Sequence, residues 1–237
     1  MLLKSHPAVV TLWRWWLRAR FVLTQRHRHN RLVIERIAGR PLVILPEVFN
    51  PALFFSSDLL AALLDRGAIP AGARVLDLGT GSGVLAVCAA RVAGEVAAVD
   101  INPAAVRCAR INALLNGVED RLTVYEGDLF APVAGRTFDV VLFNPPYFRG
   151  RPRSPLDRAF RATDVIERFA AGLPGALAPG GKALLVLSTN GEQAATLGAL
   201  ADQGYAHRPL ARRDAISELL TVYEIVPKGD SSHAGAV

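Results

Sequence analysis

One stretch in the first half of the chain limits the possible folds more than any other. Residues 74–87 form an apolar run, a turn with three glycines, and a second apolar run: Arg-Val-Leu-Asp-Leu-Gly-Thr-Gly-Ser-Gly-Val-Leu-Ala-Val. This pattern predicts a buried strand, a tight turn and the start of a helix, an arrangement that presents backbone N–H groups to a ligand. The spacing Gly-x-Gly-x-Gly is not the Gly-x-Gly-x-x-Gly of dinucleotide-binding turns, so the turn alone is a weak signal.

Two later polar motifs make the signal more specific. Asp100 ends the apolar run 96–99, and the sequence Asn144-Pro145-Pro146-Tyr147 ends the apolar run 140–143. Open α/β sheets bind ligands at the carboxyl ends of their strands, and a carboxylate there can accept hydrogen bonds from both hydroxyls of a ribose. We therefore expect the glycine turn, Asp100 and the Asn-Pro-Pro-Tyr sequence to share one site.

From residue 73 onward, short apolar runs alternate with helical patterns, which predicts an α/β fold with a parallel sheet covered on both faces. The last two strands are too close in sequence for a helical crossover, so they should pair antiparallel. The expected strands are 74–78, 95–99, 122–125, 138–143, 183–187, 205–211 and 220–226, and the expected helices are 84–93, 103–116, 164–177 and 192–203.

The motif Asp77-x-Gly-x-Gly-x-Gly, the acidic Asp100 and Asn-Pro-Pro-Tyr, in this order, resemble a class I S-adenosylmethionine-dependent methyltransferase. Among these enzymes the chain is most similar to the HemK-type glutamine N5 methyltransferases. The resemblance covers roughly residues 46–227. It implies a Rossmann-like seven-stranded sheet, mostly parallel with the last strand antiparallel, and S-adenosyl-L-methionine as cofactor.

The resemblance also assigns cofactor-binding roles. The glycines allow close backbone approach, Asp100 takes the ribose hydroxyls, and Ile101 lies against the adenine ring. A buried carboxylate needs a partner, and we expect the amino group of the cofactor's methionine part to supply one to Asp77. Asp128 can accept from the adenine amine, with Leu129 giving a backbone N–H, although a turn aspartate is the plainer interpretation of Asp128. The full predicted set is Asp77, Gly79, Thr80, Gly81, Gly83, Asp100, Ile101, Asn102, Asp128, Leu129 and Asn144.

The predicted catalytic residues are Asn144, Pro145, Pro146 and Tyr147. An amide or exocyclic amine nitrogen is a poor nucleophile because its lone pair is delocalised. The Asn144 side-chain oxygen and the Pro145 carbonyl can both accept from one NH2 group and aim its lone pair at the sulfonium methyl, a form of preorganised electrostatics. The prolines fix the carbonyl direction, and Tyr147 offers a flat face to a base or amide. Asn and Pro also favour ordinary turns. The reaction needs no metal, and no metal-ligand spacing is present.

The N-terminal region precedes this pattern. Residues 7–29 place apolar and aromatic side chains at helical spacing, and runs 32–37 and 42–45 around a Gly/Pro turn predict a β-hairpin. Ser56 or Ser57 suits the N-cap of the apolar helix that follows. We expect three regions: an extension over 1–50 (amphipathic helix plus hairpin), a methyltransferase domain over 51–227, and a flexible tail over 228–237.

The acceptor is less constrained. A protein glutamine, as in release factors, is favoured by the Asn-Pro-Pro-Tyr sequence; the alternative is adenine N6 or guanine N2 of RNA or DNA. The net charge of +6 permits an anionic partner. A loop with Arg149, Arg151, Arg153, Arg158 and Arg161 can grip phosphates or an acidic protein. A non-catalytic binding protein and a small-molecule acceptor are further alternatives. The N-terminal helix can dock an activator subunit or a second copy.

Two absences and the two cysteines bear on the location of the protein. No run of 18 residues lacks a charge, and no signal-peptide pattern is present. The two cysteines, Cys88 and Cys108, fall in predicted helices and are expected to be buried free thiols. These features predict a cytoplasmic protein without a membrane span.

Overall fold

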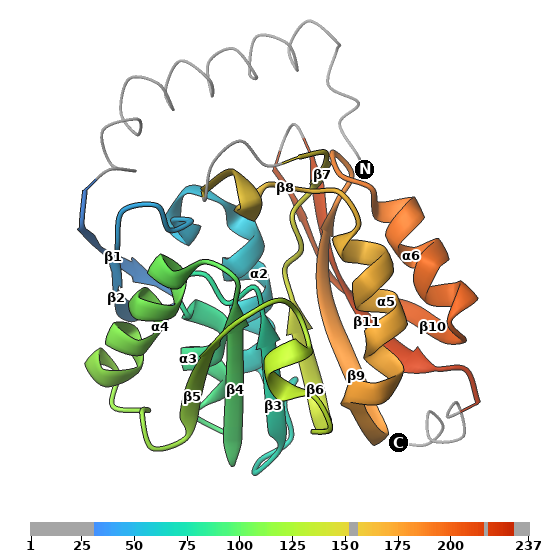
Figure 1. Cartoon of the computed structure of the whole chain (residues 1–237), viewed down its shortest axis with the longest axis horizontal. Helices are drawn as coiled ribbons and strands as arrows, with labels where there is room; N and C mark the ends of the chain where they lie inside the picture. The colour runs from blue at the N-terminus through green and yellow to red at the C-terminus, as the bar shows by residue number, and fades with distance from the viewer. Residues whose placement is uncertain (1–30, 152–155, 216–217, 230–237) are drawn as a thin grey trace, which may run out of the picture.

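The computed structural model describes residues 31–151, 156–215 and 218–229. A seven-stranded sheet forms its centre (Figure 1), with strand order β10-β11-β9-β6-β3-β4-β5. Its members are β3 (Arg74–Leu78), β4 (Glu95–Asp100), β5 (Leu122–Glu126), β6 (Phe138–Phe143), β9 (Leu177–Ser188), β10 (Tyr205–Asp214) and β11 (Leu219–Pro227).

The directions of the strands confirm the predicted topology. β3 pairs parallel with β4 and β6, β4 with β5, and β6 with β9, whereas β11 is antiparallel to both of its neighbours, β9 and β10. The last strand is therefore inserted between β9 and β10 and runs against them. The carboxyl ends of β3, β4 and β6 meet at one edge, as a binding site at this edge requires.

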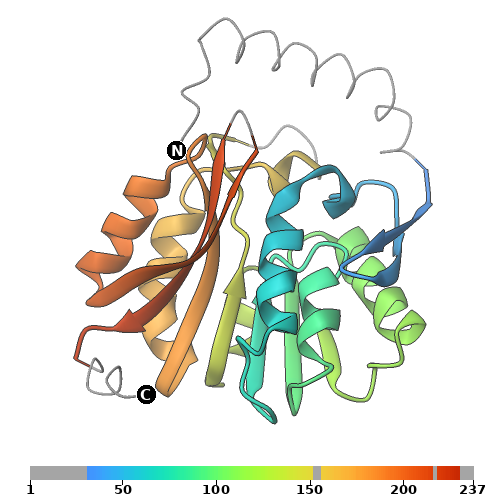
Figure 2. The ribbon, with the colours of Figure 1, turned by 180° about the vertical axis from the view of Figure 1, so that it is seen from behind.

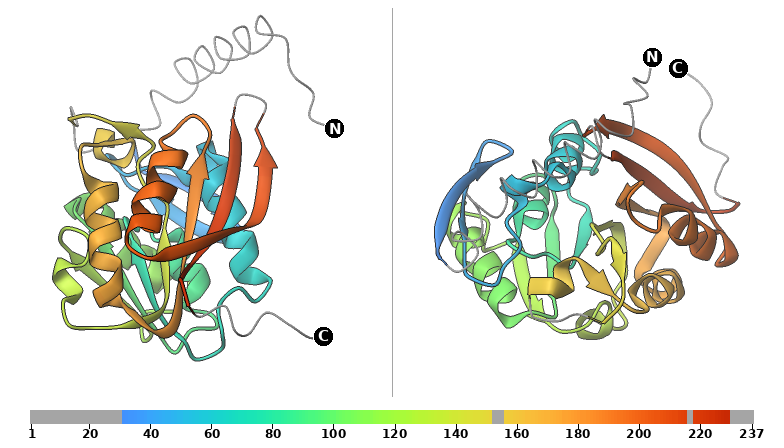
Figure 3. Two further views of the ribbon diagram at one scale, coloured as in Figure 1. Left: turned by 90° about the vertical axis from the view of Figure 1, so that its right-hand side faces the viewer. Right: turned by 90° about the horizontal axis from the view of Figure 1, so that it is seen from above.

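Helices cover both faces of the sheet (Figures 1 and 3). Alternate residues of each strand point to opposite faces, so Val75 packs with the helices of one side and Leu76 with those of the other. One face carries α2 (Phe55–Asp65), α3 (Val84–Ala89) and α4 (Pro103–Leu115); the opposite face carries α5 (Val165–Ala176) and α6 (Gln193–Asp202).

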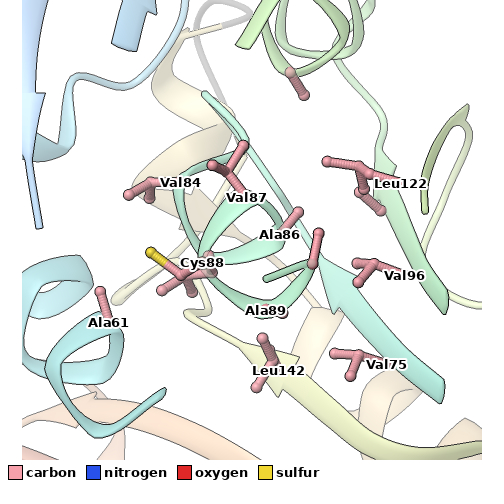
Figure 4. Close-up of a cluster of buried hydrophobic side chains, with 14 of the residues drawn as sticks. Ala61, Val75, Val84, Ala86, Val87, Cys88, Ala89, Val96, Leu122 and Leu142 are labelled. Atoms are coloured by element: carbon pink, nitrogen blue, oxygen red, sulfur yellow. The ribbon is translucent and has the colours of Figure 1, made fainter. Parts of the chain in front are cut away.

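The core beneath α3 shows how the glycine turn is supported. Figure 4 shows Ala86 and Ala89 of α3 over Val75, Val96 and Leu142 of the central strands. Small helix residues against branched strand residues bring α3 close to the sheet, which fixes the turn that precedes it. Both cysteines, Cys88 and Cys108, are buried and unpaired, as predicted.

The predicted hairpin is present as β1 (Val33–Ile37) and β2 (Arg40–Ile44). It lies beside α4 (Figure 2), where Asn112 accepts from the Val43 N–H at 2.7 Å and donates to the Val43 carbonyl at 2.7 Å. The predicted helix over 7–29 and all but the first two residues of the predicted tail over 228–237 lie outside the described residues, and the three-region division stays a prediction.

Several element boundaries were predicted wrongly. α3 ends at Ala89 rather than residue 93, and the chain turns there, with the Val92 N–H donating to the Ala89 carbonyl at 3.1 Å and the Val92 carbonyl accepting from the Gly72 N–H at 2.9 Å. α5 ends at Ala176 and β9 begins at once, at Leu177 rather than at the predicted residue 183, so Pro179-Gly180-Gly181 lies within the strand. Neither Ser56 nor Ser57 is an N-cap, because α2 begins at Phe55 and both serines lie inside its first turn.

A second small sheet, which the sequence analysis did not predict, lies above the carboxyl edge. β7 (Phe148–Arg149) pairs parallel with β8 (Arg161–Ala162), and both lie at the top of Figure 1. Short 3-10 helices complete the described elements: Pro51–Leu53, Ala131–Val133 and Leu156–Ala159. None of the helices in the described part of the chain has the length and apolar character that crossing a membrane requires.

Candidate active site

A cavity of about 400 Å³ opens at the carboxyl ends of the central strands. Its volume lies within the range of small-molecule sites, roughly 300–1,000 Å³. The structure brings nearly all of the predicted site residues to its wall. They are Gly79, Thr80, Gly81, Asp100, Ile101, Asn102, Asp128, Leu129, Asn144, Pro145, Pro146 and Tyr147. Two predicted residues, Asp77 and Gly83, are not part of the lining.

Asp77 has partners inside the protein. Its side chain is 1% exposed, and Oδ2 accepts from the Thr80 hydroxyl at 2.7 Å and from the Ala86 N–H at 3.1 Å. Burial raises the pKa of Asp77 to about 7, against the opposing effect of these two hydrogen bonds. Asp77 thus ties the glycine turn to the first turn of α3, and the carboxylate does not need the cofactor as its partner.

Gly83 differs from the other two glycines of the turn. All three have left-handed φ values, at +62°, +56° and +82° for Gly79, Gly81 and Gly83. A Cβ added at Gly79 or Gly81 would meet nothing nearer than 3.8 Å, so the space beside them is open to a ligand. A Cβ at Gly83 would lie 2.9 Å from the Ala109 Cβ. Gly83 therefore allows α3 to pack closely on α4.

Asp100 organises the turn from the neighbouring strand. Its carboxylate accepts from the Gly81 N–H at 2.8 Å and from the Asn102 N–H at 2.9 Å. Burial raises the pKa of Asp100, and the backbone N–H donors oppose that rise. Asn102 in turn caps α4 by accepting from the Ala104 N–H at 3.0 Å. Ile101, next to them, is 44% exposed and presents an apolar side chain to the cavity.

Asp128 and Leu129 form the third corner of the predicted cofactor site. Leu129 has a left-handed φ of +46°, an uncommon conformation for a branched residue. Asp128 forms an ion pair with Arg168 of α5, which also contacts Asp164 at 3.2 Å. A ligand amine that donates the predicted hydrogen bond to Asp128 must therefore share this carboxylate with Arg168.

Asn144 follows β6, and both the nitrogen and the oxygen of its side-chain amide are hydrogen-bonded. Nδ2 donates to Ser56 Oγ at 3.1 Å and to Ser57 Oγ at 3.4 Å, and Oδ1 accepts from the Tyr147 hydroxyl at 3.1 Å. Burial raises the pKa of Tyr147 well above its ordinary value, so the hydroxyl keeps its proton. Sequence reasoning considered the two serines only as helix caps and missed this contact.

An aromatic cluster on the N-terminal side of the cavity was also missed. Phe49 stacks on Phe54 with ring centroids 4.7 Å apart, and Phe160 meets Phe49 edge-on at 5.3 Å. All three rings line the cavity. The Phe-rich sequence 48–55 was the available signal, but Phe160 comes from the far side of the arginine-rich loop.

The arginine-rich loop is tied down in the structure. Arg149 pairs with Glu167 of α5 and with Glu192, the latter at 2.9 Å, and Arg161 contacts Asp157 at 3.7 Å. The Arg149 pairs link β7 to α5 and to the start of α6, whereas the Arg161–Asp157 contact stays within the loop. Arg153 and the side chain of Arg158 lie outside the described residues.

The cavity wall carries more negative than positive side chains. Its carboxylates are Glu47, Asp100, Asp128, Asp164 and Glu218, and its guanidinium groups are Arg161 and Arg168. This balance favours a cation over a phosphate. No group of three or more His, Cys, Asp or Glu side chains in residues 31–151, 156–215 and 218–229 is arranged to hold a metal ion.

Comparisons with known proteins agree on the class. The model of the "Methyltransferase small domain" family matches residues 42–205. A Methanocaldococcus jannaschii protein named "Putative protein N5-glutamine methyltransferase" is 34% identical over 200 residues, which cover 81% of this chain and 97% of the relative. The "Release factor glutamine methyltransferase" of Moorella thermoacetica is 34% identical over 152 residues, which cover 58% of this chain and 50% of that protein.

A solved structure extends the comparison to RNA enzymes. The 16S rRNA N2 G1207 methyltransferase of T. thermophilus, determined in complex with AdoMet and guanosine, superposes with a TM-score of 0.64 at 26% identity. The match covers 82% of this chain and 49% of that one.

The chain belongs to the methyltransferase small domain family. It is an S-adenosylmethionine-dependent methyltransferase with the Rossmann-like sheet of that class, which confirms the sequence prediction of fold, enzyme class and cofactor.

Proposed function

We propose that the chain transfers the methyl group of S-adenosyl-L-methionine to a planar nitrogen, and that the acceptor is a glutamine side chain of a protein. One observation supports this most directly. Asn144 and Pro145 line the same cavity as the glycine turn and Asp100, so cofactor and acceptor nitrogen can meet in one enclosed space.

The cofactor end of the cavity is formed by the glycine turn, Asp100 and the segment 127–129. Gly79 and Gly81 would leave room for the methionine part, Asp100 and Asn102 would meet the ribose, and Ile101 and Leu129 would flank the adenine; all six residues line the cavity. When bound, the cofactor supplies an electrophilic methyl on a positively charged sulfur. The excess of carboxylates in the wall stabilises such a cation.

At the acceptor end, Asn144 Oδ1 and the Pro145 carbonyl accept hydrogen bonds from the two protons of the NH2 group. Oδ1 has two lone pairs, so it can keep the Tyr147 hydroxyl and still accept from the acceptor. In the transfer, the nitrogen forms a bond to the methyl carbon, the sulfur–carbon bond breaks with its electron pair on sulfur, and the nitrogen loses one proton to water.

Charge distribution favours a protein acceptor over a nucleic acid. The 27 Lys and Arg residues exceed the 21 Asp and Glu residues by six. Residues 1–30 contain six basic and no acidic residues, so residues 31–237 hold 21 of each sign. The arginines of the loop that are described near the cavity, Arg149 and Arg161, already face carboxylates. The HemK-type assignment rests on this balance and on the names of the glutamine-modifying relatives.

The RNA alternative has its own support in the guanosine-bound relative and in the basic residues 1–30. An enzyme must be in the same compartment as its acceptor. We infer a cytoplasmic enzyme because release factors and ribosomes are found in the cytoplasm. A docked activator subunit or dimer through residues 7–29 stays a prediction.

The variant Asn144→Ala tests the assignment of the motif. We expect cofactor affinity to stay within about threefold, while the turnover number with a release-factor acceptor falls by roughly 10²–10³-fold, as when a preorganised polar group is removed. Calorimetry gives the affinity and transfer of labelled methyl gives the turnover. A large loss of cofactor affinity at unchanged turnover would mean that Asn144 mainly binds cofactor.

A further inference from the structure

The side-chain amide of Asn144 is held from an element far away in the sequence. Ser56 and Ser57 lie 88 and 87 residues before it, in the first turn of α2. Both serine side chains are buried, at 2% and 4% exposure. Neither hydroxyl is the helix cap, because α2 has Phe54 at its N-cap position without a side-chain cap bond.

Ser56 and Tyr147 engage opposite ends of the Asn144 amide. The Ser56 oxygen accepts from Asn144 Nδ2 at 3.1 Å, and the Tyr147 hydroxyl donates to Asn144 Oδ1 at 3.1 Å. The amide nitrogen thus faces a hydroxyl oxygen that can accept, and the amide oxygen faces a hydroxyl that donates.

The orientation of this amide decides whether it can activate a nitrogen. The terminal torsion of an asparagine is broad, so its oxygen and nitrogen can exchange places by rotation. With Nδ2 turned toward the acceptor, two NH2 groups would face each other and no hydrogen bond could form between them. With Oδ1 in that place, the amide accepts from the acceptor nitrogen.

We propose that Ser56 is a positioning residue that holds the Asn144 amide with Oδ1 on the acceptor side of the cavity. This inference rests on the proposed function for its effect on turnover, but the amide orientation itself does not depend on which acceptor is used. Ser57 contributes less to holding the amide, because its hydrogen bond with Asn144 Nδ2 is longer, at 3.4 Å.

The matched pair Ser56→Ala and Ser57→Ala tests the proposal. Both substitutions remove one buried hydroxyl from the same helical turn and keep the helix. For Ser56→Ala we expect the turnover number with the release-factor acceptor to fall roughly 10- to 100-fold, the scale of a small misplacement in an active site. The KM for cofactor should stay within about twofold. Ser57→Ala should lose about threefold or less, since a 3.4 Å bond is weaker.

A second measurement reports the orientation without any acceptor. In 15N-labelled protein, the Asn144 side-chain NH2 signals are assigned by their disappearance in Asn144→Asp. We expect them to shift and to exchange faster with solvent in Ser56→Ala and to stay near their wild-type positions in Ser57→Ala.

The two measurements separate the possible failures. Unchanged Asn144 signals in Ser56→Ala, or a fall in cofactor affinity equal to the fall in turnover, would overturn the positioning role. If the wild-type enzyme methylates no glutamine acceptor, the proposed function fails, while the NH2 signals still decide whether Ser56 orients the amide.

Discussion

Replacing Gly83 by alanine tests whether this glycine serves packing or the cofactor. The new Cβ would lie 2.9 Å from the Ala109 Cβ and 3.0 Å from its Cα, both fixed in the buried helix α4. Overpacking of this kind costs about 1–3 kcal/mol. The left-handed φ of +82° costs an alanine roughly 1–2 kcal/mol more. We therefore expect Gly83→Ala to lower the free energy of unfolding by about 2–5 kcal/mol.

Two further variants separate the packing cost of Gly83→Ala from its backbone cost. Gly81→Ala has a similar φ of +56° and its nearest contact is 3.9 Å away, so it should carry only the backbone cost. Ala109→Gly opens the space opposite Gly83, at a cost of about 1 kcal/mol for a glycine inside a helix. In the double variant the losses should fall short of the sum by part of the roughly 1–3 kcal/mol of overpacking, because the contact with the Ala109 Cβ is removed while the 3.0 Å approach to its Cα remains.

Urea unfolding of the cofactor-free protein measures these differences, and calorimetry gives cofactor affinity for each variant. We expect Gly83→Ala to lose stability and Gly81→Ala to lose mainly cofactor affinity. Additive losses in the double variant, or an unchanged stability of Gly83→Ala with lost affinity, would refute the packing argument and return Gly83 to the cofactor site.

Three other predictions concern charged side chains. Burial raises the pKa of Asp77 to about 7 in the folded state, so between about pH 4 and pH 7 the carboxyl ionises in the unfolded chain and the wild type loses stability as pH rises. Relative to wild type, Asp77→Asn should gain stability over this window, by at most about 4 kcal/mol, and equal differences at pH 5 and pH 8 in urea unfolding would contradict this. Asp100→Ala should weaken cofactor binding more than tenfold, because it removes the proposed ribose contact and the acceptor of the Gly81 N–H; retained binding in calorimetry would rule out the ribose role. Any affinity of the wild type for RNA should fall steeply as the salt concentration rises. Changing Arg14, Arg18 and Arg20 to Gln should make this fall less steep. Arg149→Gln and Arg161→Gln should leave the salt dependence of RNA affinity unchanged.

The sequence predicted the sheet because its signals are local. Apolar runs ended by glycine or by a polar residue mark strand ends, and the carboxyl ends of parallel strands meet at one edge. The cavity therefore assembles from Gly79, Asp100 and Asn144 as expected, although they come from three different strands. The reversed last strand followed from the short connection between β10 and β11.

The contacts that the sequence did not reveal join residues that are distant along the chain. The link between Ser56 and Asn144 spans 88 residues, and no spacing rule connects a helical turn to a strand end so far away. The roles of Asp77 and Gly83 depended on packing. Whether a carboxylate faces a ligand or the Ala86 N–H, and whether a glycine faces a cofactor or a helix, is decided by neighbours that the sequence does not specify.

The central claim is that this cavity methylates a protein glutamine, and one labelling experiment tests it most directly. The protein is incubated with cofactor labelled on its methyl group and with a mixture of release factor and ribosomal RNA, and the product is divided by protease and by nuclease. We predict label that protease releases as N5-methylglutamine and that is absent with Asn144→Ala. Label that nuclease releases as a methylated nucleoside would contradict the protein assignment and place an unpaired base against Asn144.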